Sequence, residues 1–378
     1  MQAGSAVEDF VTKISQALEG AGRRGIHVTA GAGSCDLEAQ QFGRLPEEEE
    51  PFPSGRPHHL ESPVGSRDLG GHDGTSQLCY FLDGVQSSRE IGRIGMSPVV
   101  VSTVAAAIVN RCGRRFSRMP LESPPTVVQA VILPRSAGFE KVKTFWELLL
   151  AAGFSELDPY ELPSSPHLVL DSTEYTEEAD PSDYVGMRER ARARIRKLRE
   201  RLESGMLRQW EFEDRALDSE DWIAVDGQLP STESSAPRAV GLIKSVARPE
   251  FVGRDVGMLL DLEPGMRTTS FIPDWQLRRA TTDQRTSWYL RMWPPQRGAD
   301  ALGSLMRVEA PRDTEPEQID EISRWILAER APLAKPDPRW PAMIYPIQYV
   351  EKILKPLVQG SQRAYARLER QLASNGRS

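Results

Sequence analysis

The chain has 378 residues, of which 39% are hydrophobic and 27% are charged, and its formal net charge is -7. This length and composition describe a globular protein with room for one large domain or two ordinary ones. The negative net charge argues against a chain that coats nucleic acid with its whole surface, so any binding of nucleic acid needs a local basic region.

The cysteines and the apolar segments exclude further classes of protein. Cys35, Cys79 and Cys112 lie far apart, with no CxxC pair, so the sequence indicates neither a zinc site nor a disulfide framework. No stretch approaches the roughly 20 apolar residues of a membrane span, and the N-terminus lacks the basic and apolar segments of a signal peptide. We therefore expect a cytoplasmic protein without a membrane segment.

The N-terminal part divides into a helix and a segment of biased composition. Apolar residues recur at helical spacing over 7–18, so residues 1–29 are predicted to hold an amphipathic helix that packs on the core or on a second subunit. Residues 30–76 are rich in Gly, Pro, Ser, His and Glu, with almost no apolar periodicity. We interpret residues 30–76 as a flexible low-complexity insert and residues 77–378 as the main domain.

The main domain alternates short apolar runs with helical patterns. The first candidate strand starts at Leu78, and residues 91–101 are predicted as its antiparallel hairpin partner. Further strand candidates are short and apolar: 126–133, 167–171, 222–225, 239–246, 287–292 and 305–308. Helical patterns cover 144–152, 187–203, 317–329 and a stretch beginning at Tyr345. This order of elements predicts a mixed α/β domain.

Two of the apolar runs end in Asp-Gly. Residues 78–82 lead into Asp83-Gly84, and residues 222–225 lead into Asp226-Gly227. A strand that ends on a carboxylate, followed by a glycine that lets the chain turn, is typical of sites that bind divalent cations for phosphate chemistry. Asp-Gly is also a favoured turn dipeptide, so either pair alone is more simply a turn. The two pairs together give the hypothesis of a metal site.

The helix predicted at 187–203 is the most charged stretch, with eight Arg or Lys against three Glu. Its apolar residues form one narrow stripe, so its other sides face solvent or a partner. A local positive field of this kind is typical of a nucleic-acid groove, with a solvated surface as the alternative, and Arg192, Arg196 and Arg199 are the candidate phosphate contacts. Glu203 is the glutamate nearest to Asp226 along the chain, and it is either a third metal ligand or half of a surface ion pair.

Lys244 falls within an otherwise apolar run, where an ammonium group needs a carboxylate or phosphate partner, unless it lies at a strand edge. The motifs of other chemistries are missing. The sequence has no GxxxxGK[ST] loop, no GxGxxG after a strand and no GxSxG elbow. Nucleotide hydrolysis by a P-loop, dinucleotide binding and serine hydrolysis are therefore not supported.

The order of these parts resembles the NurA nucleases, which have a ribonuclease-H-like core and act with the hexameric HerA translocase on DNA ends. The resemblance rests on short segments spread over most of the chain after residue 78: Phe81-Leu82-Asp83-Gly84, Ile223 to Leu229, Val240 to Ser245, Trp288 to Arg291, Leu305 to Glu309 and Tyr345-Pro346-Ile347. It implies a ribonuclease-H-like mixed sheet flanked by helices and a site that binds Mn²⁺ or Mg²⁺.

The resemblance also implies roles for individual residues. Asp83 and Asp226 match two of the metal ligands, and Glu203 stands for the glutamate that the family carries on a helix. The family has a histidine on its last helix, and counting from Tyr345-Pro346 that position falls on Glu351, which is a competent oxygen ligand for Mn²⁺ or Mg²⁺. Lys244 would act beside these acids, and together with the arginine-rich helix it would hold the phosphate backbone.

DNA as the substrate, a homodimer and a HerA-like hexameric ATPase as the partner follow from the same resemblance. Two alternatives stay open. The chain is either an enzyme or a catalytically inactive nucleic-acid-binding adaptor on the same fold, in which Asp83 and Asp226 survive as turn residues. The second alternative is an assembly factor that docks on an ATPase ring through residues 1–76.

Overall fold

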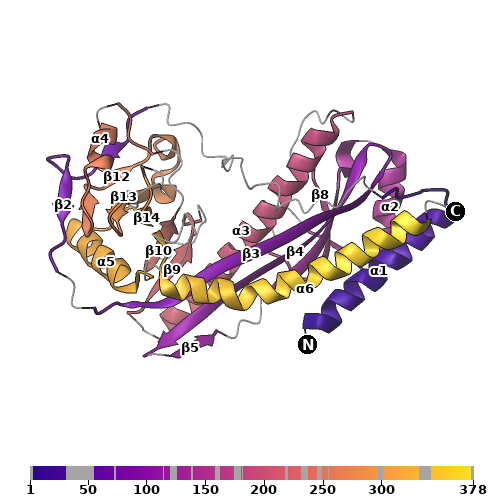
Figure 1. Ribbon diagram of the computed structural model, residues 1–378, viewed down its shortest axis with the longest axis horizontal. Coiled ribbons are helices and arrows are strands. Elements are labelled where there is room, and N and C mark those ends of the chain that lie inside the picture. The colour runs from indigo at the N-terminus through magenta and orange to yellow at the C-terminus, as the bar shows by residue number, and fades with distance from the viewer. Residues whose placement is uncertain are drawn as a thin grey trace.

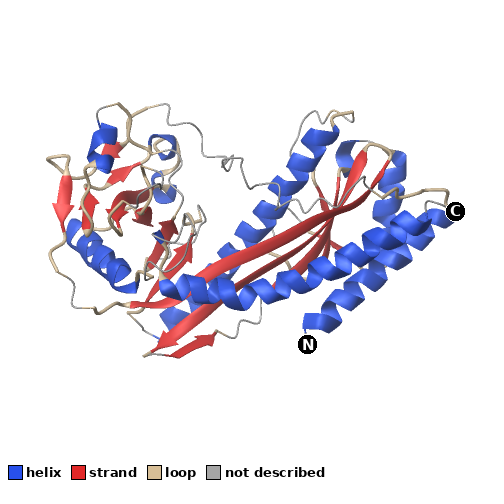
Figure 2. Cartoon of the chain, viewed as in Figure 1, coloured by secondary structure: helices blue, strands red, loops and turns tan. Residues whose placement is uncertain are grey.

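The structure is a computed structural model. It describes residues 3–30, 55–71, 74–113, 115–119, 126–137, 139–157, 162–173, 180, 182–217, 220–230, 237–244, 249–253, 255–295, 301–331 and 342–375. The molecule is an elongated mixed α/β structure, in which two long strands run through the middle with long helices on either side (Figures 1 and 2). The predicted fold class, a mixed sheet flanked by helices, is confirmed.

The elements follow one another much as the sequence predicts. The helices are α1 (Ala3–Arg23), α2 (Glu140–Ala151), α3 (Tyr184–Leu217), α4 (Asp255–Leu260), α5 (Pro316–Glu329) and α6 (Tyr345–Asn375), with the 3-10 turns η2 (Arg135–Ala137), η3 (Asp274–Gln276) and η4 (Thr281–Asp283). The strands are β1 (His58–His59), β2 (Ser66–Asp68), β3 (Leu78–Ile94), β4 (Ser97–Cys112), β5 (Arg115–Arg118), β6 (Val127–Leu133), β7 (Ser155–Glu156), β8 (His167–Asp171), β9 (Trp222–Asp226), β10 (Ala239–Ile243), β11 (Met266–Thr268), β12 (Phe271–Ile272), β13 (Arg285–Arg291) and β14 (Leu305–Pro311). No helix in the described ranges is long and apolar enough to cross a membrane.

Five central strands lie in the order β6-β4-β3-β9-β10. The pairs β3–β4 and β4–β6 are antiparallel, whereas β9 runs parallel to both β3 and β10. The helix α3 precedes β9 in the chain, so it forms part of the connection from the antiparallel strands to the parallel pair. This order and these directions match the ribonuclease-H-like sheet that the resemblance implies. On one side the sheet continues through β8 and β7, and on the other through β14, β13, β12 and β1.

The two faces of the sheet pack against different helices, because successive side chains along a strand point in opposite directions. Phe81 and Leu242 belong to a buried cluster that includes Val350 of α6 and residues of α5. Leu82 belongs to a second buried cluster, with Leu202 and other residues of α3. A third cluster joins α1, α2 and the C-terminal part of α6 to the far end of β3 and β4. Residue 83 therefore points towards the α6 face, and residue 84 towards the α3 face.

The first strand does not end at Asp83-Gly84, which corrects the sequence prediction. β3 runs on for 17 residues, and Asp83 and Gly84 pair with Ala107 and Ala106 of β4. The turn of the hairpin lies instead at Gly95, which has φ +62°. Continuous pairing with β4 outweighs the local turn preference of Asp-Gly. The predicted antiparallel hairpin is present, but its second arm is 97–112 rather than 91–101. Residues 91–94 belong to β3, which has a bulge between residues 90 and 92.

Part of the segment predicted as a flexible insert is folded, which is a second correction. β1 pairs with β12 and β2 pairs with β11, and both partners belong to the main sheet. Glu61, between these two short strands, is buried and accepts a hydrogen bond of 2.7 Å from the buried Arg267. Strands of two and three residues that are held by an ion pair leave no apolar periodicity in the sequence. Residues 31–54 of the predicted insert lie outside the described residues.

Candidate functional site

Two neighbouring strands bring Asp83 and Asp226 together. Leu82 pairs with Val225 in the parallel ladder of β3 and β9, so the aspartates that follow them occupy adjacent positions. Asp226 is also the last residue of β9, and Gly227 turns the chain with φ +103°, as the sequence predicts. By the alternation of the strands, both aspartates point towards the α6 face of the sheet.

Lys244 lies beside Asp226, directly after the third parallel strand. It is the first residue after β10 rather than a residue within it, and its Nζ donates a hydrogen bond of 2.8 Å to Oδ2 of Asp226. The partner that its ammonium group needs is thus a carboxylate. Burial acts to lower the pKa of Lys244, but Asp226, Asp83 and Glu351 outweigh burial and raise it, so Lys244 stays charged.

Asp83 is a buried carboxyl group with a strongly perturbed pKa. It is 5% exposed, and its Oδ1 accepts a hydrogen bond of 2.8 Å from the backbone N–H of Gly84. Burial raises the pKa of Asp83 well above its usual value, and the charges of Asp226, Glu203 and Glu351 raise it further, against the opposing effect of Lys244. Several carboxyl groups crowd around Asp83, and a bound cation would relieve the repulsion between them.

Glu203 approaches the same part of β3 from the α3 face. Its carboxylate lies so close to Gly84 that a Cβ atom at position 84 would be 2.1 Å from its Oε1. It is 9% exposed, and Nε of Arg199 is 3.5 Å from Oε1. Burial raises the pKa of Glu203 to about 7, with Asp226 adding to the increase and Arg199 opposing it. Glu203 is therefore a buried carboxyl group on the α3 side of the sheet, and it forms an ion pair with Arg199.

Glu351 lies on α6, the helix that covers the face to which Asp83 points. Its Oε1 is 3.0 Å from Nζ of Lys355, one helical turn further on, and its side chain is 20% exposed. Its charge contributes to raising the pKa of both Asp83 and Lys244, which places it within electrostatic reach of the site. Glu351 is thus near enough to affect Asp83 electrostatically, but its carboxylate forms an ion pair with Lys355.

The three predicted phosphate-binding arginines form a row on α3. At 100° per residue, Arg192, Arg196, Arg199 and Glu203 fall within a sector of about 60° on the helix surface. Arg199 lies next to Glu203, whereas the Nη1 of Arg192 donates a hydrogen bond of 2.5 Å to Glu189. The row leads along the helix towards the acidic residues, and contact with phosphate stays a prediction for all three arginines.

A divalent cation fits the chemistry of these side chains, but the ligands are not preassembled. Carboxylate oxygens are hard donors that suit Mg²⁺ and Mn²⁺, and a bound cation would lower the raised pKa of Asp83. Within the described part of the chain, however, no three His, Cys, Asp or Glu side chains come close enough together to hold a metal ion.

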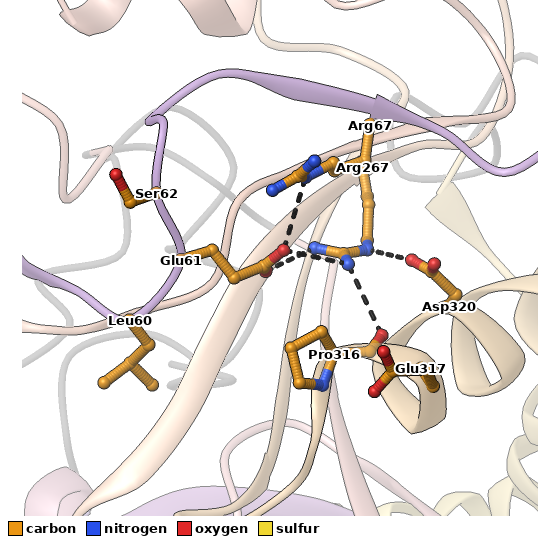
Figure 3. Close-up of a pocket in the computed structure, with 8 residues that line it drawn as sticks. All are labelled: Leu60, Glu61, Ser62, Arg67, Arg267, Pro316, Glu317 and Asp320. Atoms are coloured by element: carbon orange, nitrogen blue, oxygen red, sulfur yellow. Dashed lines mark hydrogen bonds and ion pairs between the residues drawn. The ribbon is translucent and has the colours of Figure 1, made fainter.

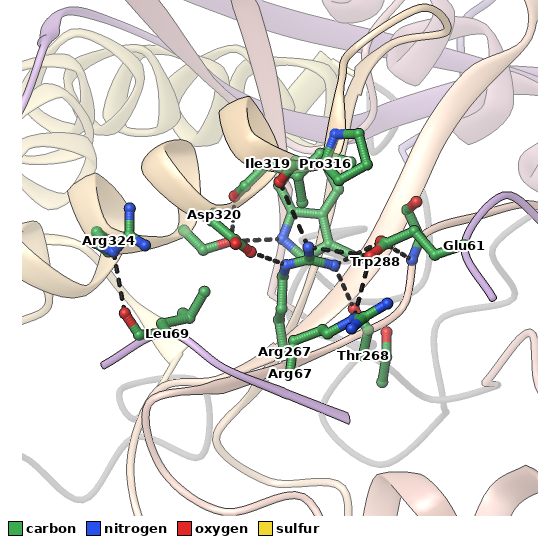
Figure 4. A network of polar contacts seen from close by, with 12 residues as sticks. Glu61, Arg67, Leu69, Arg267, Thr268, Trp288, Pro316, Ile319, Asp320 and Arg324 are labelled. Atoms are coloured by element: carbon green, nitrogen blue, oxygen red, sulfur yellow. Dashed lines mark hydrogen bonds and ion pairs between the residues drawn. The ribbon is translucent and has the colours of Figure 1, made fainter. Parts of the chain in front are cut away.

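A second polar region lies away from these acids, in a pocket of about 350 Å³ between α5 and the segment of residues 60–67 (Figure 3). Arg267 crosses this pocket and is 1% exposed. Its guanidinium donates to both carboxylate oxygens of Glu61, to Asp320, and to the backbone oxygens of Thr268 and Pro316 (Figure 4). Since the guanidinium already binds protein partners on all sides, this network stabilises the fold rather than offering a ligand site.

Gly84 is the residue of the site whose role sequence reasoning missed. The sequence pattern predicts that Gly84 is a turn residue. The structure instead places Gly84 inside β3, with the carboxylate of Glu203 next to it. Residues 84 and 203 are too far apart in the chain for any local pattern to reveal this contact. Comparison with the second Asp-Gly pair does not reveal this role either, because a Cβ atom at Gly227 would have nothing within 4 Å.

Comparison with known proteins finds similarity among solved structures only. No family model matches the sequence, and no curated protein matches it. Among solved structures, the chain is similar to the NurA nuclease from Sulfolobus solfataricus, with 11% sequence identity over 81% of this chain and 88% of that chain, and a TM-score of 0.43. A likeness of this size establishes neither the family nor the activity of this chain.

Proposed function

We propose that the protein is a metal-dependent nuclease that hydrolyses phosphodiester bonds in DNA. One observation carries this proposal: Asp83 and Asp226 on adjacent parallel strands meet Lys244, which directly follows the third parallel strand, and further carboxyl groups raise the pKa of Asp83. Buried acids that crowd one another in this way are more often found at functional sites than in a stable core. The chain as a whole is negatively charged, so the arginine row on α3 would supply the local positive charge that DNA binding needs.

Each side chain has a part in this proposal. Asp83 and Asp226 would hold a Mn²⁺ or Mg²⁺ ion, and Glu203 and Glu351 are the candidates to complete its ligands. When bound, the cation supplies Lewis-acid polarisation of the phosphate and a more acidic water molecule. Lys244 orients the carboxylate of Asp226 through its hydrogen bond. Arg199, Arg196 and Arg192 would position the phosphate backbone along α3.

The experiment is a cleavage assay on linear single-stranded and double-stranded DNA with Mn²⁺, Mg²⁺ or EDTA. We expect cleavage that needs a divalent cation and that Asp83→Ala and Asp226→Ala both abolish. Asp313→Ala serves as the control, because the side chain of Asp313 is 94% exposed and lies on a loop after β14. Undiminished cleavage by both active-site variants would refute the assignment of the site.

A catalytically inactive DNA-binding adaptor is the second candidate function. It is favoured by the finding that the described acids form no ready-made metal site and that Lys244 already neutralises Asp226. The adaptor would bind DNA equally well in Mn²⁺ and in EDTA and would cleave it under neither condition. The cleavage assay therefore separates the two candidates directly.

The assembly that we propose follows from the resemblance of the sequence to NurA nucleases. In it the protein is a cytoplasmic homodimer that works with a HerA-like hexameric ATPase in DNA end processing, repair or defence. Light scattering of the purified protein tests the dimer, and we expect twice the mass of one chain. Co-purification with a HerA-like ATPase from the same source tests the partner, and two separate elution peaks would contradict it.

A further inference from the structure

We propose that Gly84 is a positioning residue of the candidate site, because only a residue without a side chain leaves space for the carboxylate of Glu203 against β3, at the residue that follows Asp83. This inference rests on the proposed function and identifies the residue that admits the third carboxyl group. It concerns two residues that lie 119 positions apart in the chain and on different elements, β3 and α3.

The backbone at Gly84 gives no reason for a glycine. Gly84 pairs with Ala106 inside a regular antiparallel ladder, and its φ lies outside the left-handed region that favours glycine. Gly227 of the other Asp-Gly pair is the opposite case, since it has φ +103° and nothing within 4 Å of its Cβ direction. A glycine inside a strand destabilises it relative to alanine, so the presence of Gly84 calls for a different cause.

That cause is the space around it. A Cβ atom at position 84 would lie 2.1 Å from Oε1 and 2.9 Å from Cδ of Glu203, and 3.1 Å from Cγ of Arg199. No carbon and oxygen atoms approach to 2.1 Å without a bond between them, so the carboxylate of Glu203 and a side chain at position 84 exclude each other. The missing side chain of Gly84 is thus the space into which Glu203 extends to reach the sheet.

The consequence is a local effect on the site. The clashing atoms are the free end of a flexible glutamate side chain, so Glu203 can rotate away when residue 84 gains a methyl group. The fold then persists, while the carboxylate leaves the position in which it acts on Asp83 and Asp226. Residue 84 therefore controls a carboxyl group that approaches from the opposite face of the sheet.

The test is a double-mutant cycle on the binding of Mn²⁺ to the full-length protein, measured by titration calorimetry. We expect Gly84→Ala to raise the Kd for Mn²⁺ about tenfold or more, which is the effect of removing a group that orients metal ligands. Glu203→Ala should raise the Kd similarly, and adding Gly84→Ala to Glu203→Ala should change nothing further. Gly257→Ala is the matched control, because a Cβ there has nothing within 4 Å. Wild-type affinity in Gly84→Ala, or independent effects that multiply in the double variant, would overturn the inference.

Thermal unfolding without metal gives a second readout that does not depend on the proposed function. Gly84→Ala should raise the melting temperature in the Glu203→Ala background, where the methyl group has room, by more than it does in the wild type. If Gly84→Ala fails to fold, Glu203→Ala should restore folding. Equal shifts in both backgrounds, or no restoration, would overturn the inference. A wild-type protein that binds no Mn²⁺ would sink the proposed metal site, and this cycle would still decide whether residues 84 and 203 compete for one space.

Discussion

Replacing Glu203 with glutamine removes a carboxyl group that the fold makes hard to ionise. The side chain is buried under the sheet, and glutamine keeps its size while remaining neutral at every pH. Burial raises the pKa of Glu203 from 4.5 to about 7 in the folded protein, so the unfolded chain gives up this proton more readily. The Glu203→Gln variant should therefore differ from the wild type in a way that depends on pH.

The sign and size follow from proton linkage. Because the pKa is higher in the folded state, the free energy of unfolding of the metal-free wild type falls as pH rises from 4.5 to 7, and the full loss is present above pH 7. A pKa difference of about 2.5 corresponds to about 3 kcal/mol. We thus expect Glu203→Gln to be more stable than the wild type by up to about 3 kcal/mol at pH 8 and nearly equal to it at pH 4.5.

The assay is urea unfolding in EDTA between pH 4.5 and 8.5, followed by circular dichroism. Glu321→Gln is the control, because Glu321 is an exposed carboxyl group on α5 and its loss should leave the pH dependence unchanged. A Glu203→Gln variant that is less stable than the wild type at pH 8 would refute the reasoning. A constant difference at all pH values would refute it equally, since it would show that ionisation of Glu203 is not involved.

Three other predictions follow from the same structure. Mn²⁺ at 100 times its Kd should stabilise the wild type by about 2.7 kcal/mol at pH 8 in urea unfolding, and it should not stabilise Asp83→Asn. Glu61→Gln leaves the buried Arg267 without its main counter-charge, so we expect a loss of about 3 kcal/mol or more in the free energy of unfolding. Lys244→Met removes the hydrogen bond to Asp226, and cleavage of DNA should fall at least about tenfold.

Each of these predictions has a result that contradicts it. Equal stabilisation of the wild type and of Asp83→Asn by Mn²⁺ would place the cation elsewhere. An unfolding free energy of Glu61→Gln within about 1 kcal/mol of the wild type would show that Arg267 is held by its other partners. Full activity of Lys244→Met would show that Asp226 needs no orienting partner.

The two Asp-Gly pairs show how far the sequence predicts this site. At Asp226 the strand ends and the glycine turns the chain, as local preference indicates. At Asp83 the same dipeptide continues in a strand, because 14 positions of β3 pair with β4 and that tertiary pairing outweighs the turn. The two aspartates occupy adjacent positions because β3 and β9 run parallel and Leu82 pairs with Val225, a pairing that the sequence alone does not specify.

Glu203 and residues 58–68 show what the sequence does not contain. Helical geometry places Glu203 well away from the apolar stripe of α3, so its burial depends on a gap at Gly84 that only the folded sheet creates. The strands at 58–59 and 66–68 are too short for any periodicity, and the buried pair of Glu61 and Arg267 joins residues 206 positions apart. Long-range contacts of this kind depend on the topology, which local patterns do not specify.

The bulge in β3 has a consequence for how this chain can change in evolution. Shifting a strand by one residue turns every side chain to the opposite face, and in a hairpin such a shift would bring Asp83 under α3. The ladder of β3 and β4 already changes register between residues 90 and 92. The register of pairing near Gly95 therefore differs from the register of pairing at Asp83. The tip of the hairpin can therefore gain or lose residues over time while the acid keeps its side of the sheet.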